Sequence, residues 1–266
     1  MTQRIITASA LIAVVVLFFF LGPVAASLLV LGCTLLALVE ELRVLRGAGH
    51  RVPRWPSWVA LLAGAPALAF FSTRAVMPLL VLMLLVNAVR VIFGPEPKLD
   101  AMLLSEVPIL SIVAPGLALL GLVFHDPAGS HMFYLALAIG IAEGGDTLAL
   151  FGGVRFGRNK LCEAVSPKKT IEGSMFGLLG SVLAGYLMWG LFSLIGAAVC
   201  SGWVILPLAL LGGAAGQLGD LFASMVKRFC GVKDFSNIFP GHGGMMDRMD
   251  SVLFTGLVIY SFLLLV

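Results

Sequence analysis

Residues 108–124 read PILSIVAPGLALLGLVF, an apolar segment without a single charged side chain. An α-helix crosses the ~30 Å hydrocarbon core of a bilayer with about 20 mostly apolar residues. Eight comparable segments flank this one along the chain, at residues 5–21, 24–39, 57–73, 76–93, 132–150, 174–196, 203–222 and 249–266. The sequence therefore predicts an all-α, polytopic transmembrane helix bundle with about nine spans.

The composition excludes a soluble globular protein. The chain has 266 residues, of which 60% are hydrophobic and 12% charged, whereas soluble domains carry about 25% charged residues. A transmembrane β-barrel would show segments of about 10 residues with alternating polarity, and the apolar segments here do not alternate. Arg4, the first apolar segment and Val24–Ser27 also resemble a signal peptide, but the next apolar segment follows without a polar stretch.

The distribution of positive charge predicts the orientation in the membrane. With nine spans and the N-terminus inside, 16 of the 17 Lys and Arg residues fall on the inner side, and only Arg74 falls outside. Such an excess is the usual mark of cytoplasmic loops. We therefore expect a cytoplasmic N-terminus and a multi-pass protein of a bacterial-type inner membrane, with its active site facing the cytoplasm.

The two parts of the chain differ in character. Residues 1–130 hold plain apolar spans and one basic loop, 40–56, which we interpret as membrane-surface electrostatics. Residues 131–266 carry carboxylates inside spans and two inner loops, 152–173 and 227–248, which hold nine of the 17 basic residues. We expect the first part to be a lipid-facing scaffold and the second to be the catalytic region.

Three carboxylates lie within predicted spans. Glu143 and Asp146 are spaced i and i+3 in the sixth span, and Asp220 lies in the eighth. Carboxylates at membrane depth are costly and usually face a water-filled cavity with a function. For Glu143 and Asp146, ion conduction or helix capping is an alternative. The nearby run of small residues at 212–216 predicts close helix packing instead of chemistry.

Residues 219–250 contain the densest set of polar side chains. On a helix Asp220 and Ser224 share one face, with Lys227 and Arg228 just beyond. The loop 240–244 reads PGHGG, and its glycines allow backbone N–H groups to approach an anion. Carboxylates beside phosphate-binding cations suit Mg²⁺. The alternative is an ion-pair network that ties two helices together.

Asp247 and Asp250 follow that loop and can present two carboxylates on one face of the last helix. Upstream, Ser166-Pro167 predicts an extended turn, and Lys168 and Lys169 next to it are typical phosphate or headgroup ligands. Taken alone, this second segment could anchor anionic lipid. Together the two segments predict a metal and phosphate site at the membrane surface.

The segment 224–250 resembles the signature of the phosphatidate cytidylyltransferase family (CDP-diacylglycerol synthases). Each fixed position of that signature is filled, by Ser224, Lys227, Arg228, Lys233, Asp234, Ser236, His242, Gly243, Gly244, Asp247, Arg248 and Asp250. Residues 166–173 resemble the family's second block, and Gly219-Asp220 its carboxylate before the signature. The resemblance covers about residues 140–266.

The resemblance implies transfer of CMP from CTP to phosphatidate, with pyrophosphate as the second product, and a Mg²⁺ or Mn²⁺ cofactor. It implies Asp220 and Asp247 as metal ligands, with Asp250 and Asp146 as further candidates. Catalytic or substrate-binding roles fall to Ser166, Lys168, Lys169, Ser224, Lys227, Arg228, Lys233, His242, Gly243, Gly244 and Arg248. We expect CTP, a lipid phosphate and membrane lipid as partners, a possible homodimer, and no nucleic acid.

One position departs from the family pattern. After the carboxylate that corresponds to Asp146 the family has a Tyr, where this chain has Leu150. This difference leaves open a second acceptor, such as a polyprenyl phosphate or a variant glycerol phosphate. An anion or phosphate transporter is an alternative from another class, although the halves show no internal repeat of the kind many transporters have.

Overall fold

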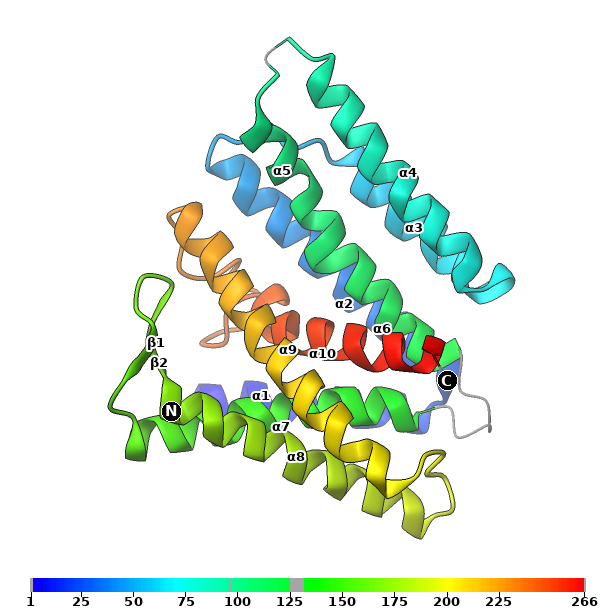
Figure 1. Ribbon diagram of the computed structural model, residues 1–266, viewed down its shortest axis with the longest axis vertical. Coiled ribbons are helices and arrows are strands. Elements are labelled where there is room, and N and C mark those ends of the chain that lie inside the picture. Colours follow the sequence, from blue (N-terminus) through cyan, green and yellow to red (C-terminus); the bar gives the residue numbers. More distant parts are fainter. Residues whose placement is uncertain (1, 96, 125–131, 266) are drawn as a thin grey trace.

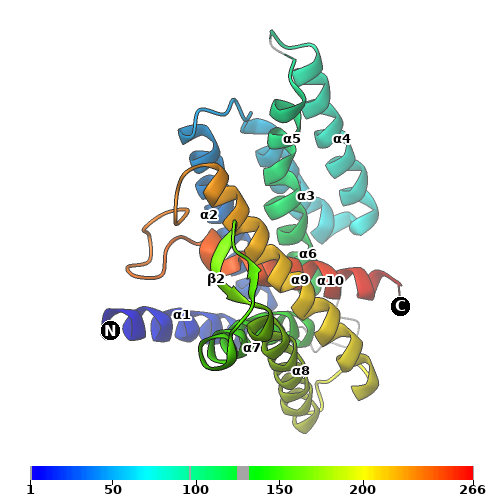
Figure 2. The same cartoon turned by 60° about the vertical axis from the view of Figure 1, so that its left-hand side comes forward.

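The computed structural model describes residues 2–95, 97–124 and 132–265, and it is predominantly helical (Figures 1 and 2). The helices are α1 Thr2–Phe20, α2 Pro23–Gly47, α3 Trp55–Phe71, α4 Thr73–Ile92, α5 Leu99–Pro108, α6 Ala114–Phe124, α7 Phe133–Phe156, α8 Ile171–Leu194, α9 Gly202–Phe229 and α10 Met246–Leu265. The π-helix η1, Ile109–Val113, joins α5 to α6. Each of the nine expected spans coincides with a helical segment, so the predicted fold class is confirmed.

Within the described residues, seven helical segments are long and apolar enough to cross a membrane, with α5, η1 and α6 counted as one. The helix α3 is apolar but has only 17 residues. Val266, the last residue of the ninth expected span, lies outside the described residues. The chain is thus a multi-pass membrane protein, and its orientation remains a prediction.

Backbone features at three points separate or bend the helices. Gly22 has a φ of 94°, which glycine adopts readily, and Pro23 then starts α2, where its missing N–H costs nothing. Ser72 has a φ of 96° between α3 and α4, an uncommon value for a residue with a Cβ. Pro108 precedes the wide turn of η1, and a proline within a helix removes one backbone hydrogen bond.

The helices form two groups with α10 between them. In Figure 1, α2, α3, α4 and α6 lie in one group, while α7 and α8 lie side by side in the other and α9 crosses them. The helix α10 packs against α9, α6, α7 and α2. It therefore connects the N-terminal helices to those that carry the predicted site residues.

Small residues allow close approach where α9 meets its neighbours. A Cβ atom added to Gly216 would lie 2.7 Å from Oγ1 of Thr255 on α10, and one added to Gly213 would clash with Ser181 on α8. Small residues are the common means by which helices approach closely in a membrane. The prediction that the run 212–216 serves close packing is confirmed.

A short β-hairpin within the loop 152–173 adds a feature to the expected all-α fold. Strands β1, Lys160–Cys162, and β2, Ser166–Thr170, pair antiparallel, with Lys160 opposite Thr170 and Cys162 opposite Ser166. The extended backbone expected at Ser166-Pro167 is therefore part of a strand. Thr170 ends β2 and caps α8, because its side-chain oxygen accepts a hydrogen bond from the Gly173 N–H at 3.1 Å.

Candidate active site

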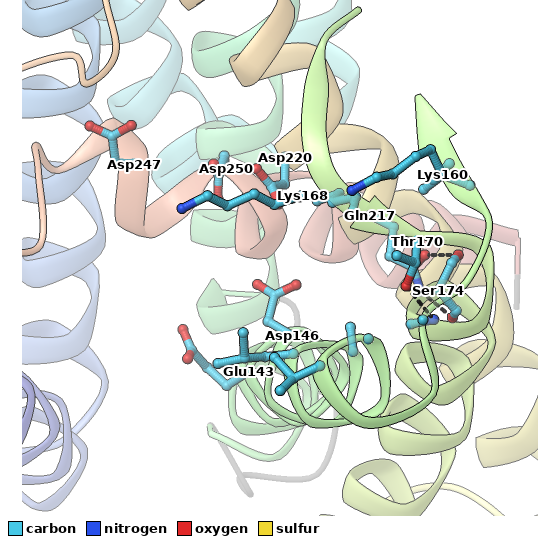
Figure 3. A pocket seen from close by; sticks show the side chains of 18 of the residues that line it. Glu143, Asp146, Lys160, Lys168, Thr170, Ser174, Gln217, Asp220, Asp247 and Asp250 are labelled. Carbon is cyan, nitrogen blue, oxygen red and sulfur yellow. Dashed lines mark hydrogen bonds and ion pairs between the residues drawn. The ribbon is translucent and has the colours of Figure 1, made fainter. Parts of the chain in front are cut away.

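A cavity of about 820 Å³ lies where the β-hairpin meets α7, α8, α9 and α10 (Figure 3). Its wall includes polar and charged side chains from all of these elements and from the loop before α10, namely Glu143, Asp146, Lys160, Lys168, Lys169, Thr170, Ser174, Gln217, Asp220, Lys227, Asp234, Asp247, Arg248 and Asp250. Apolar residues of α7 complete the wall, among them Ala149, Leu150 and Val154. The loops 152–173 and 227–248 therefore converge on one cavity, as the sequence predicts.

Carboxylates face each other across this cavity. Figure 3 shows Asp146 and Glu143 on α7 pointing toward the side where Asp220 and Asp250 lie, on α9 and α10. The i and i+3 spacing of the first two places both on the same face of α7, and helix α9 carries Asp220 to the opposite wall. Negative charge from three helices thus meets in one polar space.

A lysine of the β-hairpin reaches the first predicted metal ligand. Nζ of Lys169 on β2 lies 2.5 Å from Oδ2 of Asp220, and both side chains are about one-quarter exposed. The hydroxyl of Ser224 donates to Oδ1 of the same carboxylate at 3.4 Å, which confirms that Asp220 and Ser224 share one helix face. The ion pair fixes the hairpin over α9.

The second predicted metal ligand, Asp247, is buried in a set of hydrogen bonds. Nζ of Lys227 lies 2.6 Å from its Oδ1, and its Oδ2 accepts from the backbone N–H groups of Phe235 and Gly244, each at 2.9 Å. Both oxygens are therefore engaged by the protein itself. In this arrangement Asp247 holds the loop before α10, and its role as a metal ligand stays a prediction.

The glycine-rich loop folds back on itself next to Asp247. The backbone N–H of Phe239 donates to the carbonyl of Gly243 at 3.0 Å, and Gly243 has a φ of 81°. A Cβ added to Gly243 would lie 2.8 Å from Oδ2 of Asp247, so a side chain does not fit there. Nδ1 of His242 is buried and has no hydrogen-bond partner among the described residues.

The cavity also contains cations that are available to an anionic ligand. Within the described ranges, no ion pair joins Lys168 of β2 or Arg248 of α10 to a carboxylate, and both side chains are exposed. Lys160 donates to the carbonyl of Pro167 at 2.6 Å and so braces the hairpin while it lines the cavity. Phosphate groups are the natural ligands for such an arrangement.

Most of the charged residues proposed from the sequence come together here. Those that line the cavity are Asp146, Lys168, Lys169, Asp220, Lys227, Asp247, Arg248 and Asp250. Those that do not are Ser166, Ser224, Arg228, Lys233, His242, Gly243 and Gly244. Of the second group, Arg228 donates to the carbonyl of Val232 at 3.2 Å, and Lys233 is exposed.

Sequence reasoning missed several lining residues. Gln217 on α9 and Ser174 on α8 form a reciprocal pair, in which the Gln217 amide donates to the Ser174 carbonyl at 3.0 Å and the Ser174 hydroxyl donates to the Gln217 side chain. A local signal existed, because Gln217 precedes Asp220 by three residues and so shares its helix face. Thr170 directly follows the predicted Lys169, and Lys160 lies opposite Thr170 on β1. Asp234, a position of the family signature, also lines the cavity.

The donor set fits a divalent cation, although no cluster of ligands is assembled in advance. Among the residues that the structure describes, no three His, Cys, Asp or Glu side chains are close enough together to hold a metal ion. Mg²⁺ uses one or two protein carboxylates and completes its shell with water and substrate phosphates. Asp220, Asp146 and Asp250 supply such oxygens around the cavity.

Comparison with known proteins agrees with this chemistry. The family model described as "Cytidylyltransferase family" matches residues 2–266, and so includes the N-terminal helices. A Synechocystis protein named phosphatidate cytidylyltransferase is 42% identical over 144 residues, which are 52% of this chain and 45% of that protein. The Thermotoga maritima protein of the same name is 40% identical over 116 residues, 43% of each chain.

A chloroplastic relative shows the same similarity over a smaller share of its length. Phosphatidate cytidylyltransferase 4 of Arabidopsis thaliana is 42% identical over 125 residues, 44% of this chain and 29% of that protein. This chain therefore spans less than half the length of these curated relatives. The family model, in contrast, matches residues 2–266, which is nearly the whole of this chain. With the cavity and its charged lining, it establishes that the chain belongs to the cytidylyltransferase family.

Proposed function

We propose that the protein transfers CMP from CTP to phosphatidate and releases pyrophosphate, and so supplies CDP-diacylglycerol for phospholipid synthesis. The observation that carries this proposal is the cavity in which cations of the hairpin, α9 and α10 face the carboxylates of three helices. The names of the similar proteins support it. Membership of a transferase family also removes the reason to prefer a transporter.

In this reaction the protein has to neutralise the charge of the two substrates and to position them. An oxygen of the lipid phosphate attacks the α-phosphorus of CTP, and the bond from that phosphorus to the bridging oxygen breaks as pyrophosphate leaves. The nucleophile is already ionised, so no side chain has to remove a proton from it. Holding two polyanions in line is then the main contribution.

The lining residues divide these tasks. Lys168 and Arg248 carry no ion pair to a described carboxylate and would bind phosphate oxygens directly. Lys169 and Lys227 are paired to carboxylates and would share their charge with the substrates. A bound Mg²⁺ or Mn²⁺, held by the carboxylates that face the cavity, would neutralise charge on the departing pyrophosphate.

The test uses the purified full-length protein with CTP, phosphatidate and Mg²⁺. We expect release of pyrophosphate together with a lipid that carries CMP, identified by mass spectrometry. Without lipid, turnover should be negligible, because the ionised lipid phosphate is the nucleophile in the proposed reaction and water is a much weaker one. A chelator should abolish turnover, and added Mg²⁺ or Mn²⁺ should restore it. Pyrophosphate release that needs no lipid would contradict the proposal.

A second candidate is transfer of CMP to another lipid phosphate. Leu150 lines the cavity and is 64% exposed, at the position where the family pattern has a Tyr. Competition among phosphatidate, polyprenyl phosphate and variant glycerol phosphates decides between the acceptors. If phosphatidate is the acceptor, it should dominate the product mixture. A different CDP-lipid as main product would keep the mechanism and replace the acceptor.

We also propose that the cavity opens toward the cytoplasm across a bacterial-type inner membrane. Cysteines introduced at Asn159 and Asn237, both exposed, should react with an impermeant thiol reagent only after cell lysis. The four native cysteines are free and partly exposed, so they are replaced by serine before the new cysteines are introduced. Labelling of intact cells would show the inverted topology. The mass of the detergent-solubilised protein tests the proposed homodimer.

A further inference from the structure

One side chain from the N-terminal helices reaches the loop that precedes α10. Glu40 lies near the end of α2, is 1% exposed, and does not line the cavity. Its Oε1 accepts hydrogen bonds from the Ser236 hydroxyl at 2.5 Å and the Met245 N–H at 3.0 Å, and its Oε2 accepts from the Met246 N–H at 2.8 Å. A buried carboxylate thus receives three donors from a segment about 200 residues away.

Two of these donors belong to the start of a helix. Met246 is the first residue of α10, and the first N–H groups of a helix have no acceptor within the helix. A negative charge at this end also interacts favourably with the helix dipole. Glu40 therefore determines where α10 begins relative to α2.

The Glu40 carboxylate also explains why the last residue of the PGHGG loop, Gly244, is a glycine. A Cβ added to Gly244 would lie 2.7 Å from Cδ of Glu40, so only glycine allows the loop to approach this closely. The N–H of Gly244 donates to Asp247 and is not directed to a substrate. This glycine serves the contact with Glu40 and Asp247.

Glu40 and Asp247 each bind residues near both ends of the loop 235–246. Glu40 binds Ser236 and the residues 245–246, while Asp247 binds the N–H groups of Phe235 and Gly244. The two carboxylates together fix both ends of residues 235–246. Arg248 and Asp250 follow directly on α10 and line the cavity.

We propose that Glu40 is a positioning residue for the reaction, because it sets the loop 235–246 and the start of α10, and thereby the place of Arg248 and Asp250 in the cavity. The inference rests on the proposed function. It also assigns to the N-terminal helices a part in the chemistry, although they line none of the cavity within the described ranges.

The neighbouring residue provides a matched control. Glu41 is also fully buried in α2, but its carboxylate accepts from the Ser111 hydroxyl of η1, with oxygen–oxygen distances of 2.9 and 3.2 Å. The substitutions Glu40→Gln and Glu41→Gln make the same chemical change one residue apart. Only the first affects donors of the loop before α10.

The experiment compares kcat, KM and thermal midpoint for Glu40→Gln, Glu40→Asp, Ser236→Ala and Glu41→Gln in the full-length protein. In Glu40→Gln one oxygen becomes an NH₂ group that faces a backbone N–H, and misplacement near 1 Å can lower rates about 100-fold. We expect a loss of that order in kcat, with KM for CTP changed much less. Glu40→Asp, which keeps the charge, should restore part of kcat.

Ser236→Ala removes one of the three donors and should lower kcat less than Glu40→Gln does. Glu41→Gln should keep kcat close to the wild-type value even if its thermal midpoint falls as far. Equal losses of kcat in Glu40→Gln and Glu41→Gln at equal midpoints would overturn the proposal, as would a wild-type kcat in Glu40→Gln.

Backbone hydrogen exchange separates this inference from the proposed function. In Glu40→Gln the amides of Met245 and Met246 should exchange faster than in the wild type, and in Glu41→Gln they should not. A wild-type protein without turnover on CTP and phosphatidate would refute the proposed function, and exchange alone would then decide whether Glu40 holds the loop. Unchanged exchange in Glu40→Gln would refute the positioning role in either case.

Discussion

The N-terminal helices and the cavity region both bury polar side chains, but they use them differently. In the first region several polar groups find their partners inside the helix packing, as Glu41 does with the Ser111 hydroxyl and Asn87 does with the Ser105 carbonyl. In the second region Asp146 and Asp250 face an open cavity, and Lys169 reaches Asp220 from another element. Polar groups with closed partners stabilise a helix packing, whereas those that face a cavity can bind a ligand.

The largest effect of a substitution is expected at Asp247. This side chain has closed hydrogen-bond partners and also lines the cavity. Asp247→Asn removes the charge opposite Lys227 and disturbs the loop before α10. We expect kcat to fall by about 100- to 1,000-fold, the range seen when one transition-state contact is removed from a site. Steady-state kinetics of the purified variant at saturating Mg²⁺ measure this.

Burial of this ion pair adds a cost that the sequence alone does not predict. The side chains of Lys227 and Asp247 are 9% and 5% exposed, and breaking a buried pair by removal of one partner costs about 3–5 kcal/mol. The thermal midpoint of Asp247→Asn should therefore fall. Asp100→Asn, at an exposed position of α5, is the control and should change neither quantity. A wild-type rate in Asp247→Asn would refute its place in the active site.

A smaller effect is expected at the partly exposed pair of the hairpin. Lys169→Met removes the partner of Asp220, with the two side chains 25% and 27% exposed. Because solvent screens such pairs, the free energy of unfolding should change by only about 0–1 kcal/mol. Loss of a cation next to the substrate phosphates should still lower kcat/KM by about 10-fold or more.

Arg51→Met, in the loop between α2 and α3, is the control for that variant, since it removes an exposed cation outside the cavity. Kinetics and thermal unfolding of both variants give the comparison. If Lys169→Met lost stability while kcat/KM stayed at the wild-type value, the hairpin lysine would belong with the structural pairs of the N-terminal helices.

The sequence predicted the helices well because their cause is local. A run such as 108–124 is apolar over enough residues to cross a membrane, and no distant contact is needed to recognise it. The spacing of Asp220 and Ser224 predicted a shared helix face for the same reason. These properties follow from the period of the helix and the thickness of the bilayer.

The parts that sequence reasoning missed depend on contacts between distant segments. We interpreted the loop that begins at Glu40 as membrane-surface electrostatics, yet Glu40 itself is buried and binds Ser236. Nothing near residue 40 in the chain indicates this partner. Likewise, Asp247 was expected to face a metal, and its three hydrogen-bond donors became visible only in the folded chain.

The smallest effects are expected at two side-chain amides that form hydrogen bonds between neighbouring helices, one in each region. Asn87 on α4 donates to the Ser105 carbonyl on α5 at 3.1 Å, and Gln217 on α9 donates to the Ser174 carbonyl on α8 at 3.0 Å. Asn87 also donates to Oε2 of Glu106, and Gln217 also accepts from the Ser174 hydroxyl, so Asn87→Ala and Gln217→Ala each remove two hydrogen bonds. The net contribution of one such bond to stability is about 0.5–1.5 kcal/mol. The two variants should therefore lose similar stability.

Their kinetics should differ, because only Gln217 lines the cavity. We expect Gln217→Ala to raise KM for CTP or the lipid about 5- to 10-fold, the loss that corresponds to about 1–1.4 kcal/mol of binding, and Asn87→Ala to leave KM unchanged. Thermal unfolding and steady-state kinetics of the two variants, measured side by side, check this. If both variants raised KM equally, the kinetic effect would come from looser helix packing in general, and the distinction between closed polar pairs and cavity-facing ones would not hold at Gln217.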